Sequence, residues 1–219
     1  MAAALLLFSF QGMRAQSAQA LRDSLKMATE ELAYHPDSVD LRLRKASLNL
    51  LLEQWSYAKE EYDFILRHEP MNLAALFYRA YTNEKLHRNN FARLDYETML
   101  SIVPGNFDGQ LGLTLLNQKD KHYTEALDMA NRLVSQYPDN AEAYAARAGI
   151  EKEQGMVSLS LFDYAEALRL SPANREVRID YADALLQDGQ KPAARRQLDE
   201  LVKQGVSRAA LSEFYARCK

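Results

Sequence analysis

The chain has few of the residues that mark other protein classes. Its 219 residues include one cysteine, Cys218, so an internal disulfide is impossible. It has only eight glycines, and the group Gly105, Gly109 and Gly112 does not have the spacing of a phosphate-binding loop. The net charge is −3 and no block of lysine or arginine stands out, which argues against a nucleic-acid partner.

No catalytic or metal-binding pattern is present either. The four histidines have no partner at the i, i+4 spacing of a helical metal site, and none recurs in register with a carboxylate: His35, His68, His87 and His122. No Ser-His-Asp or Cys-His arrangement can be assembled, because Cys218 is the penultimate residue. We therefore predict no catalytic residue, no metal site and no cofactor, and we do not expect an enzyme.

The few prolines are instead regularly spaced. Five of the six fall 34 residues apart, at Pro36, Pro70, Pro104, Pro138 and Pro172. A residue that can cap a helix follows two positions after each of them: Ser38, Asn72, Asn106, Asn140 and Asn174. Proline ends a helix, and serine or asparagine caps the next one by accepting from its free N–H groups. The chain is therefore an internal repeat with a helix stop and a helix start in every copy.

The repeats are the segments 39–72, 73–106, 107–140, 141–174 and 175–208, with positions counted from the first residue of each. Position 8 is small in every copy: Ala46, Ala80, Thr114, Ala148 and Ala182. Position 20 is small as well: Ala58, Ala92, Ala126, Ser160 and Ala194. Position 24 is larger in four copies, Tyr62, Tyr96, Tyr164 and Leu198, and is Ala130 in the third. Small residues at two fixed places predict two helices that approach closely.

This pattern resembles the tetratricopeptide repeat family, which has small residues at positions 8 and 20, an aromatic at 24 and proline at 32. The resemblance covers 170 of the 219 residues; Ala130 and Val206 depart from it, in place of the aromatic and the last proline. It implies an all-α fold, a right-handed superhelical solenoid of antiparallel helix pairs. We expect about five units, each with helices at positions 1–14 and 17–31. An N-terminal capping helix at 21–38 and a C-terminal one at 209–219 would bring the total to twelve helices.

Two charged positions vary together across the repeats. Positions 7 and 23 pair a basic with an acidic residue in three copies: Lys45 with Glu61, Arg79 with Asp95, and Arg147 with Asp163. Where position 7 is Leu113 or Tyr181, position 23 is uncharged. This predicts an ion pair across each of the three helix pairs.

The N-terminus differs from the repeats. Ala2 to Phe10 form an uncharged, largely apolar run that is too short to span a bilayer, and small residues follow it at Ala18 and Ala20. The segment 1–20 therefore resembles a secretory signal peptide, although no basic residue precedes the run, as would follow if the true start lay upstream. We expect export to the periplasm or cell envelope, with no membrane span after signal removal. No cysteine follows the run, so attachment of lipid to an N-terminal cysteine is not expected.

The family resemblance also implies a binding surface, because the first helix of each repeat lines a concave face in that family, chiefly through positions 2, 5, 9, 12 and 13. The partner-binding residues predicted in this way are Leu43, Ser47, Phe77, Tyr78, Tyr81, Lys85, Leu111, Leu115 and Gly149. The alternative is that the aromatic rings among them turn into the core between helices.

The predicted function is a non-catalytic scaffold that holds a protein or peptide in this groove, favoured as a monomer in the bacterial cell envelope. Two alternatives stay open. The chain could be a self-associating structural protein of the envelope, or a cytoplasmic adaptor if the N-terminal segment is not a signal.

Overall fold

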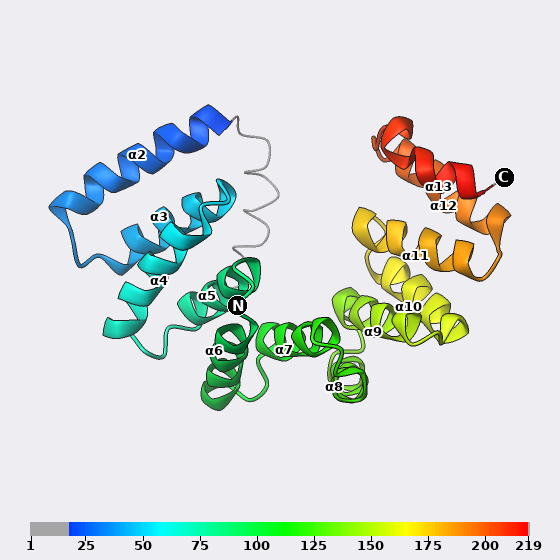
Figure 1. Cartoon of the computed structure of the whole chain (residues 1–219), viewed down its shortest axis with the longest axis horizontal. Coiled ribbons are helices and arrows are strands. Elements are labelled where there is room, and N and C mark those ends of the chain that lie inside the picture. The colour runs from blue at the N-terminus through cyan, green and yellow to red at the C-terminus, as the bar shows by residue number, and fades with distance from the viewer. Residues whose placement is uncertain (1–17, 219) are drawn as a thin grey trace. The chain divides into compact units, whose positions relative to one another are not determined.

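The structure of the protein, a computed structural model, describes residues 18–218. Within them it contains twelve α-helices and one short 3₁₀ helix, with no strand (Figure 1). The helices are α2 (Ala18–Tyr34), α3 (Val39–Leu51), α4 (Trp55–His68), α5 (Leu73–Lys85), α6 (Asn89–Ile102), α7 (Phe107–Lys119), α8 (Tyr123–Gln136), α9 (Ala141–Glu153), α10 (Val157–Leu170), α11 (Arg175–Gln187), α12 (Lys191–Lys203), η1 (Arg208–Leu211) and α13 (Ser212–Arg217). The predicted all-α fold is confirmed.

The chain divides within α7 into two compact units, Met1–Leu113 and Thr114–Lys219. In the first, each helix from α2 to α6 packs against the next one along the chain. In the second, the same holds from α8 to α12, and α13 packs on α11 and α12. Each unit is therefore a stack of helix pairs, the packing of a solenoid.

The helix boundaries keep the 34-residue spacing. In all five repeats the first helix covers positions 1–13, and the second begins at position 17. The predicted caps are present: the side-chain oxygens of Ser38, Asn72, Asn106, Asn140 and Asn174 each accept an N–H from the first turn of the following helix. Each cap satisfies a backbone donor that a helix start leaves open.

The turn inside each repeat depends on one left-handed residue, at position 15. Gly155 and Gly189 adopt it with φ of 74°. Glu53, His87 and Lys121 take the same place in the other repeats with φ between 56° and 63°. A side chain in this region costs about 1–2 kcal/mol, so three of the five turns hold local strain that glycine would relieve.

The core lies between the two helices of each repeat. All ten small residues at positions 8 and 20 are fully buried, with no exposed surface. The five residues at position 24 are buried beside them: Tyr62, Tyr96, Ala130, Tyr164 and Leu198. This confirms the close approach that the small residues predict.

The three predicted ion pairs are present. Lys45 Nζ lies 2.6 Å from Glu61 Oε1, and Arg147 Nε lies 2.5 Å from Asp163 Oδ2. Arg79 holds Asp95 with two parallel hydrogen bonds, of 2.6 and 3.0 Å. Its third bond crosses to the preceding repeat, from Nη1 to Asp63 Oδ1 at 3.0 Å, so the arginine joins three helices.

Both ends of the array carry extra helices. The predicted N-terminal capping helix corresponds to α2, which buries Leu21, Ala28 and Leu32. At the C-terminus the predicted single helix at 209–219 is divided instead: Ser207 caps a 3₁₀ turn, and α13 starts only at Ser212. The predicted signal peptide at 1–20 lies outside the described residues apart from its last three, with which α2 begins.

One glycine is required by a buried aromatic ring. A Cβ atom on Gly112 would lie 2.4 Å from two ring carbons of Tyr96, far inside van der Waals contact. We expect Gly112→Ala to lower the free energy of unfolding, because overpacking costs about 1–3 kcal/mol while alanine gains about 0.5–1 kcal/mol of helix propensity. Urea unfolding followed by circular dichroism measures the difference.

Gly149 provides a matched control in the middle of α9, since the nearest atom to its added Cβ is Gln118 Nε2 at 3.6 Å. Gly149→Ala should therefore be neutral or stabilising. Equal effects of the two substitutions would show that Tyr96 does not constrain Gly112.

Candidate functional site

The predicted groove residues lie on the first helices of their repeats. In the first unit these are α3 with Leu43 and Ser47, α5 with Phe77, Tyr78, Tyr81 and Lys85, and the first half of α7 with Leu111. All of them except Tyr78 keep some exposed surface. In the second unit, Leu115 is 41% exposed and Gly149 is half-buried. Their role in binding a partner remains a prediction.

Tyr78 is the exception, because it lies in the core and not on the predicted binding surface. The residue is only 4% exposed, and its ring stacks on Tyr62 with centroids 6.1 Å apart. Burial raises the pKa of Tyr78 to about 12. Because it sits next to Phe77 on α5, it points about 100° away from that ring and into the core between repeats.

Tyr81 is the centre of a small cluster of aromatic and basic side chains. Trp55, the first residue of α4, meets its ring edge-on with centroids 6.2 Å apart. Lys85 Nζ lies 5.1 Å from the centroid of the same ring, a cation–π distance. The sequence reasoning missed Trp55, because it comes from a second helix of a repeat. The cluster brings two aromatic rings, set nearly perpendicular to each other, together with a cation.

Phe77 packs against two buried tyrosine rings, Tyr78 and Tyr96. Its ring lies 5.2 Å from Tyr78 and 6.3 Å from Tyr96 between centroids. The Tyr96 hydroxyl donates to Glu84 Oε1 at 2.9 Å, and burial together with the Glu84 charge raises the pKa of this tyrosine. Phe77 is therefore a partly exposed ring on a rigid aromatic base.

In the second unit the corresponding helices carry charge. Asp183 on α11 accepts from Lys152 Nζ at 3.1 Å and from Arg217 Nη1 at 2.7 Å. Burial opposes ionisation of this carboxyl, but these two cations outweigh it and lower the pKa of Asp183. Arg217 belongs to α13, so this pair also ties the last helix to the array.

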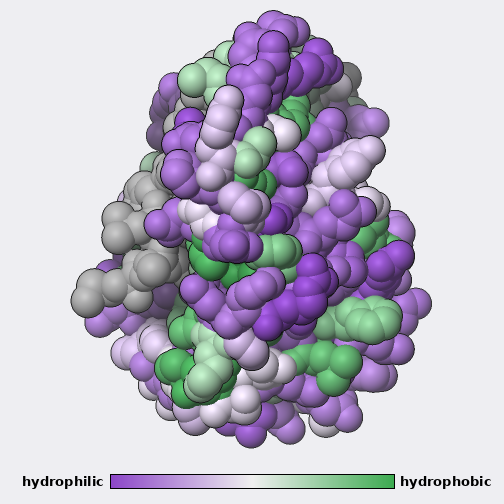
Figure 2. All heavy atoms as spheres, turned by 90° about the vertical axis from the view of Figure 1, so that its left-hand side faces the viewer, coloured by the Kyte–Doolittle hydropathy of each residue, from purple (hydrophilic) through white to green (hydrophobic). Residues whose placement is uncertain are grey.

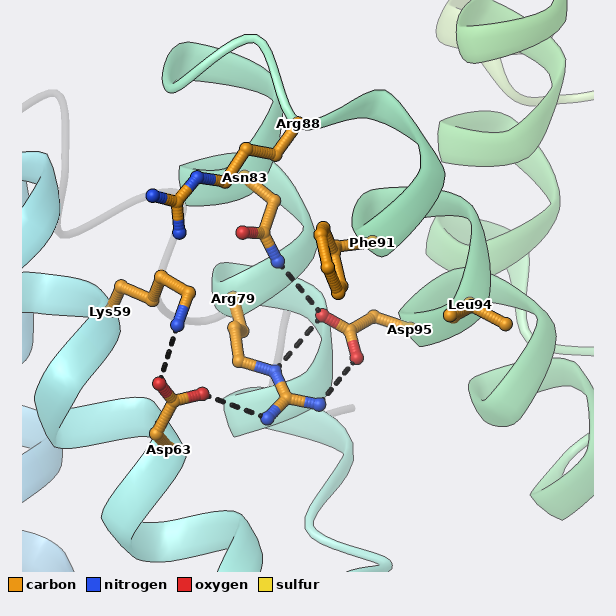
Figure 3. Close-up of a pocket in the computed structure, with 8 residues that line it drawn as sticks. All are labelled: Lys59, Asp63, Arg79, Asn83, Arg88, Phe91, Leu94 and Asp95. Carbon is orange, nitrogen blue, oxygen red and sulfur yellow. Dashed lines mark hydrogen bonds and ion pairs between the residues drawn. The ribbon is translucent and has the colours of Figure 1, made fainter.

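The view in Figure 2 shows a face that is mostly hydrophilic, with hydrophobic residues in separate patches rather than one continuous area. A distinct hollow lies in the first unit between α4, α5 and α6, with a volume of about 270 Å³. Figure 3 shows the residues that line it: Lys59, Asp63, Arg79, Asn83, Arg88, Phe91, Leu94 and Asp95. The sequence analysis did not predict this pocket.

Two further features are absent from the described residues. No group of three histidine, cysteine or acidic side chains between residues 18 and 218 is placed to hold a metal ion. In the same part of the chain, no helix has the length and hydrophobicity needed to cross a membrane.

Comparison with known proteins agrees with this architecture. Residues 153–218 match the model of a tetratricopeptide repeat family. A tetratricopeptide repeat protein from Parabacteroides merdae superposes with a TM-score of 0.81 at 20% identity, over 94% of this chain and 80% of that one. Residues 153–218 therefore contain tetratricopeptide repeat sequence, and the described chain shares the fold of tetratricopeptide repeat proteins.

Two further solved structures extend the comparison. A tetratricopeptide repeat protein of Thermus thermophilus gives a TM-score of 0.72 at 20% identity, covering 83% of this chain and 98% of its own. YrrB, a further tetratricopeptide repeat protein, superposes with a TM-score of 0.53 at 16% identity, over 81% of this chain and 91% of that one. Among curated proteins, none matches the chain in sequence.

The repeat at 141–174, in the second unit, buries a carboxyl group that its ion pair does not satisfy. Glu151 Oε1 lies 3.9 Å from Arg147 Nε, at the edge of ion-pair distance, while Oε2 has no hydrogen-bond partner among the described residues. Arg147 is already committed to Asp163 with two hydrogen bonds. Burial first, and then the charge of Asp163, raise the pKa of Glu151 to about 7.

This pKa predicts that stability falls as pH rises. Between the ordinary glutamate value, near 4.5, and about 7, the folded chain binds a proton at Glu151 that the unfolded chain has lost. We expect the free energy of unfolding to drop by roughly 1–3 kcal/mol across this range, and then to level off. Glu151→Gln should flatten this part of the profile in urea unfolding measured at several pH values.

The exposed Glu153, two residues along α9, supplies the control for this experiment. Glu153→Gln should keep the slope of the native protein. A profile of Glu151→Gln that still falls between pH 4.5 and 7 would assign the slope to another group.

Proposed function

We propose that the chain is a non-catalytic scaffold that holds a segment of a partner protein against the first helices of its repeats. The fold supports a protein–protein interaction scaffold, because a stack of helix pairs presents repeated side chains on a rigid frame. The observation that carries the proposal is the cluster of Tyr81, Trp55 and Lys85, partly exposed and fixed by its own ring contacts.

The chemistry of this cluster fits an extended peptide. Aromatic side chains that are already rigid bind with little loss of conformational entropy, and they are common anchors at interfaces. Lys85 is exposed and can pair with a carboxylate of the peptide. YrrB, which shares the fold, is described as having an unusual peptide-binding site, and this supports the same use here.

We also propose that the chain acts in the cell envelope. The support is the apolar run Ala2–Phe10 with small residues at Ala18 and Ala20, the pattern of a cleaved secretory signal. The cytoplasmic adaptor and the self-associating envelope protein remain the alternatives to this assignment.

Site-specific photo-crosslinking tests the groove. With a photoreactive phenylalanine analogue in place of Tyr81, we expect a discrete adduct with a partner protein in cells. The same analogue at Tyr34, which is 83% exposed on α2, should give no such adduct. Equal adducts at both positions, or an adduct only with a second copy of the chain, would contradict a peptide-holding groove.

Cell fractionation and N-terminal sequencing test the compartment. We expect the mature protein in the envelope fraction, beginning at residue 21 after the Ala18-Gln19-Ala20 site. Leu5→Asp combined with Leu7→Asp should leave an uncleaved chain in the cytoplasm, because charge in the apolar run blocks export. An intact Met1 on the native protein in the cytoplasmic fraction would favour the cytoplasmic adaptor.

A further inference from the structure

Helix α6 exposes two large apolar side chains that its repeat does not need for folding. Phe91 is 59% exposed and Leu94 is 58% exposed, at positions 19 and 22. The same positions hold Glu125 and Asp128 in α8, which forms an equally regular second helix. Because a charged pair serves the fold as well at these positions, the apolar pair in α6 is free to take another use.

These two side chains are among the residues that line the pocket of about 270 Å³ between α4, α5 and α6 (Figure 3). The α5 residues in the pocket are Arg79 and Asn83, each two positions after a predicted groove residue, Phe77 and Tyr81. Two positions correspond to about 200° around a helix, so the pocket lies on the opposite side of α5 from the groove. It is a separate surface.

Most of the charges in the pocket are already paired. Asp63 accepts from Lys59 Nζ at 2.5 Å and from Arg79 Nη1 at 3.0 Å. Asp95 accepts two bonds from Arg79, and Asn83 Nδ2 adds a third at 3.4 Å. Both carboxylates are therefore occupied, and neither is available to attract a cation.

Two polar groups of the pocket, the Asn83 side-chain oxygen and the Arg88 guanidinium, have no such partner among residues 18–218. The Asn83 side-chain oxygen is buried, in a residue only 2% exposed, and it has no hydrogen-bond partner among residues 18–218. Its orientation is fixed, because the amide nitrogen has to face the acceptor Asp95. The oxygen points away from Asp95 and toward the side of the pocket where Arg88 lies (Figure 3). Arg88 is exposed, and no ion pair holds its guanidinium within the described chain.

We propose that this pocket binds a segment of a partner protein in which an acidic residue stands next to an apolar one. The carboxylate pairs with Arg88, the residue of the pocket that remains free to do so. A backbone N–H of the segment donates to the buried Asn83 oxygen, which otherwise carries the cost of an unmade hydrogen bond. The apolar side chain covers Phe91 and Leu94. With three basic and two acidic residues in its lining, the pocket favours an acidic segment over a basic one.

The second unit has a pair of exposed apolar side chains at the same positions as Phe91 and Leu94, but the polar residues beside it differ. Leu159 and Phe162 occupy positions 19 and 22 of α10 and are 55% and 68% exposed. At the position of Asn83, however, this repeat has the buried carboxyl of Glu151, and Met156 replaces Arg88. A surface with Met156 in place of Arg88, and with the carboxyl of Glu151 in place of the Asn83 amide, should reject the same segment, so it provides an internal control.

Two blocked synthetic peptides that differ in one residue test the proposal, one with Leu-Glu-Phe and one with Leu-Gln-Phe between glycine and serine residues. In an NMR titration of the ¹⁵N-labelled chain, we expect the Glu peptide to shift the Asn83 side-chain amide and the Arg88 Nε–H. The Gln peptide should bind about tenfold more weakly, which corresponds to about 1.4 kcal/mol, because it cannot form the charged hydrogen bonds with Arg88. Equal affinities, or shifts at Phe77 and Tyr81 instead, would overturn the proposal.

Matched variants locate the binding. Phe91→Glu with Leu94→Asp introduces the residues of α8, so it should keep the thermal unfolding profile and lose binding of the Glu peptide. Leu159→Glu with Phe162→Asp should bind the Glu peptide as the native chain does; an equal loss would contradict the assignment to this pocket. The groove variant Phe77→Ala with Tyr81→Ala should also bind it normally, which separates this test from that of the proposed groove.

Sedimentation velocity at several protein concentrations decides the occupant. A monomer with every variant supports the peptide segment. A dimer of the native chain that Phe91→Glu with Leu94→Asp abolishes would overturn the proposal and assign the face to a second copy.

Discussion

The close approach of two helices at their small residues is the constraint on which the rest of the structure depends. All ten residues at positions 8 and 20 are fully buried, and none is larger than threonine. A larger side chain at any of them would push the paired helices apart, because protein interiors are packed too densely to absorb added volume. The interior of each repeat is therefore held by a few positions, and the outward side of each helix is left free to vary.

Ion pairs and hydrogen bonds between repeats follow a second, longer period. In repeats 1, 3 and 5 the side chain at position 4 donates to the carbonyl of the proline six residues earlier: Arg42 to Pro36, Gln110 to Pro104, and Arg178 to Pro172. Repeats 2 and 4 have Leu76 and Tyr144 at that position. There an arginine at position 7 reaches the preceding repeat, from Arg79 to Asp63 and from Arg147 to Asn131. Successive repeats are thus joined by two kinds of contact in turn, a hydrogen bond from position 4 and one from position 7, and this pattern of contacts recurs every two repeats.

The sequence predicted the elements whose cause is local or recurs in every copy. Caps after each proline, small residues between helices and the charges at positions 7 and 23 were all readable in this way. The burial of Tyr78 was not predictable, because the sequence does not distinguish it from Phe77 and Tyr81, the aromatic residues near it on the same helix. Its place in the core is set by Tyr62 of the preceding repeat. The outer pocket was missed for a similar reason, because its walls come from three helices. The side-chain oxygen of Asn83 is directed into the pocket only because the amide nitrogen donates to Asp95. Comparison of alternate repeats would have revealed the apolar pair at positions 19 and 22.

The side chains of α5 point to two opposite sides of the helix, so one helix contributes residues to two surfaces. Phe77 and Tyr81 face one side, Arg79 and Asn83 the other, and Ala80 lies at the contact with α6 between them. Arg79 is fixed by Asp63 and Asp95 on two neighbouring helices, so neither surface can shift without breaking an ion pair. Such pairs add little to stability when exposed, but here Asp95 is buried while Arg79 and Asp63 are half-buried, and removing Arg79 would leave the buried charge of Asp95 unpaired. The network therefore acts mainly to fix the register of α4, α5 and α6, and that register determines the shape of the pocket and the positions of Phe77 and Tyr81.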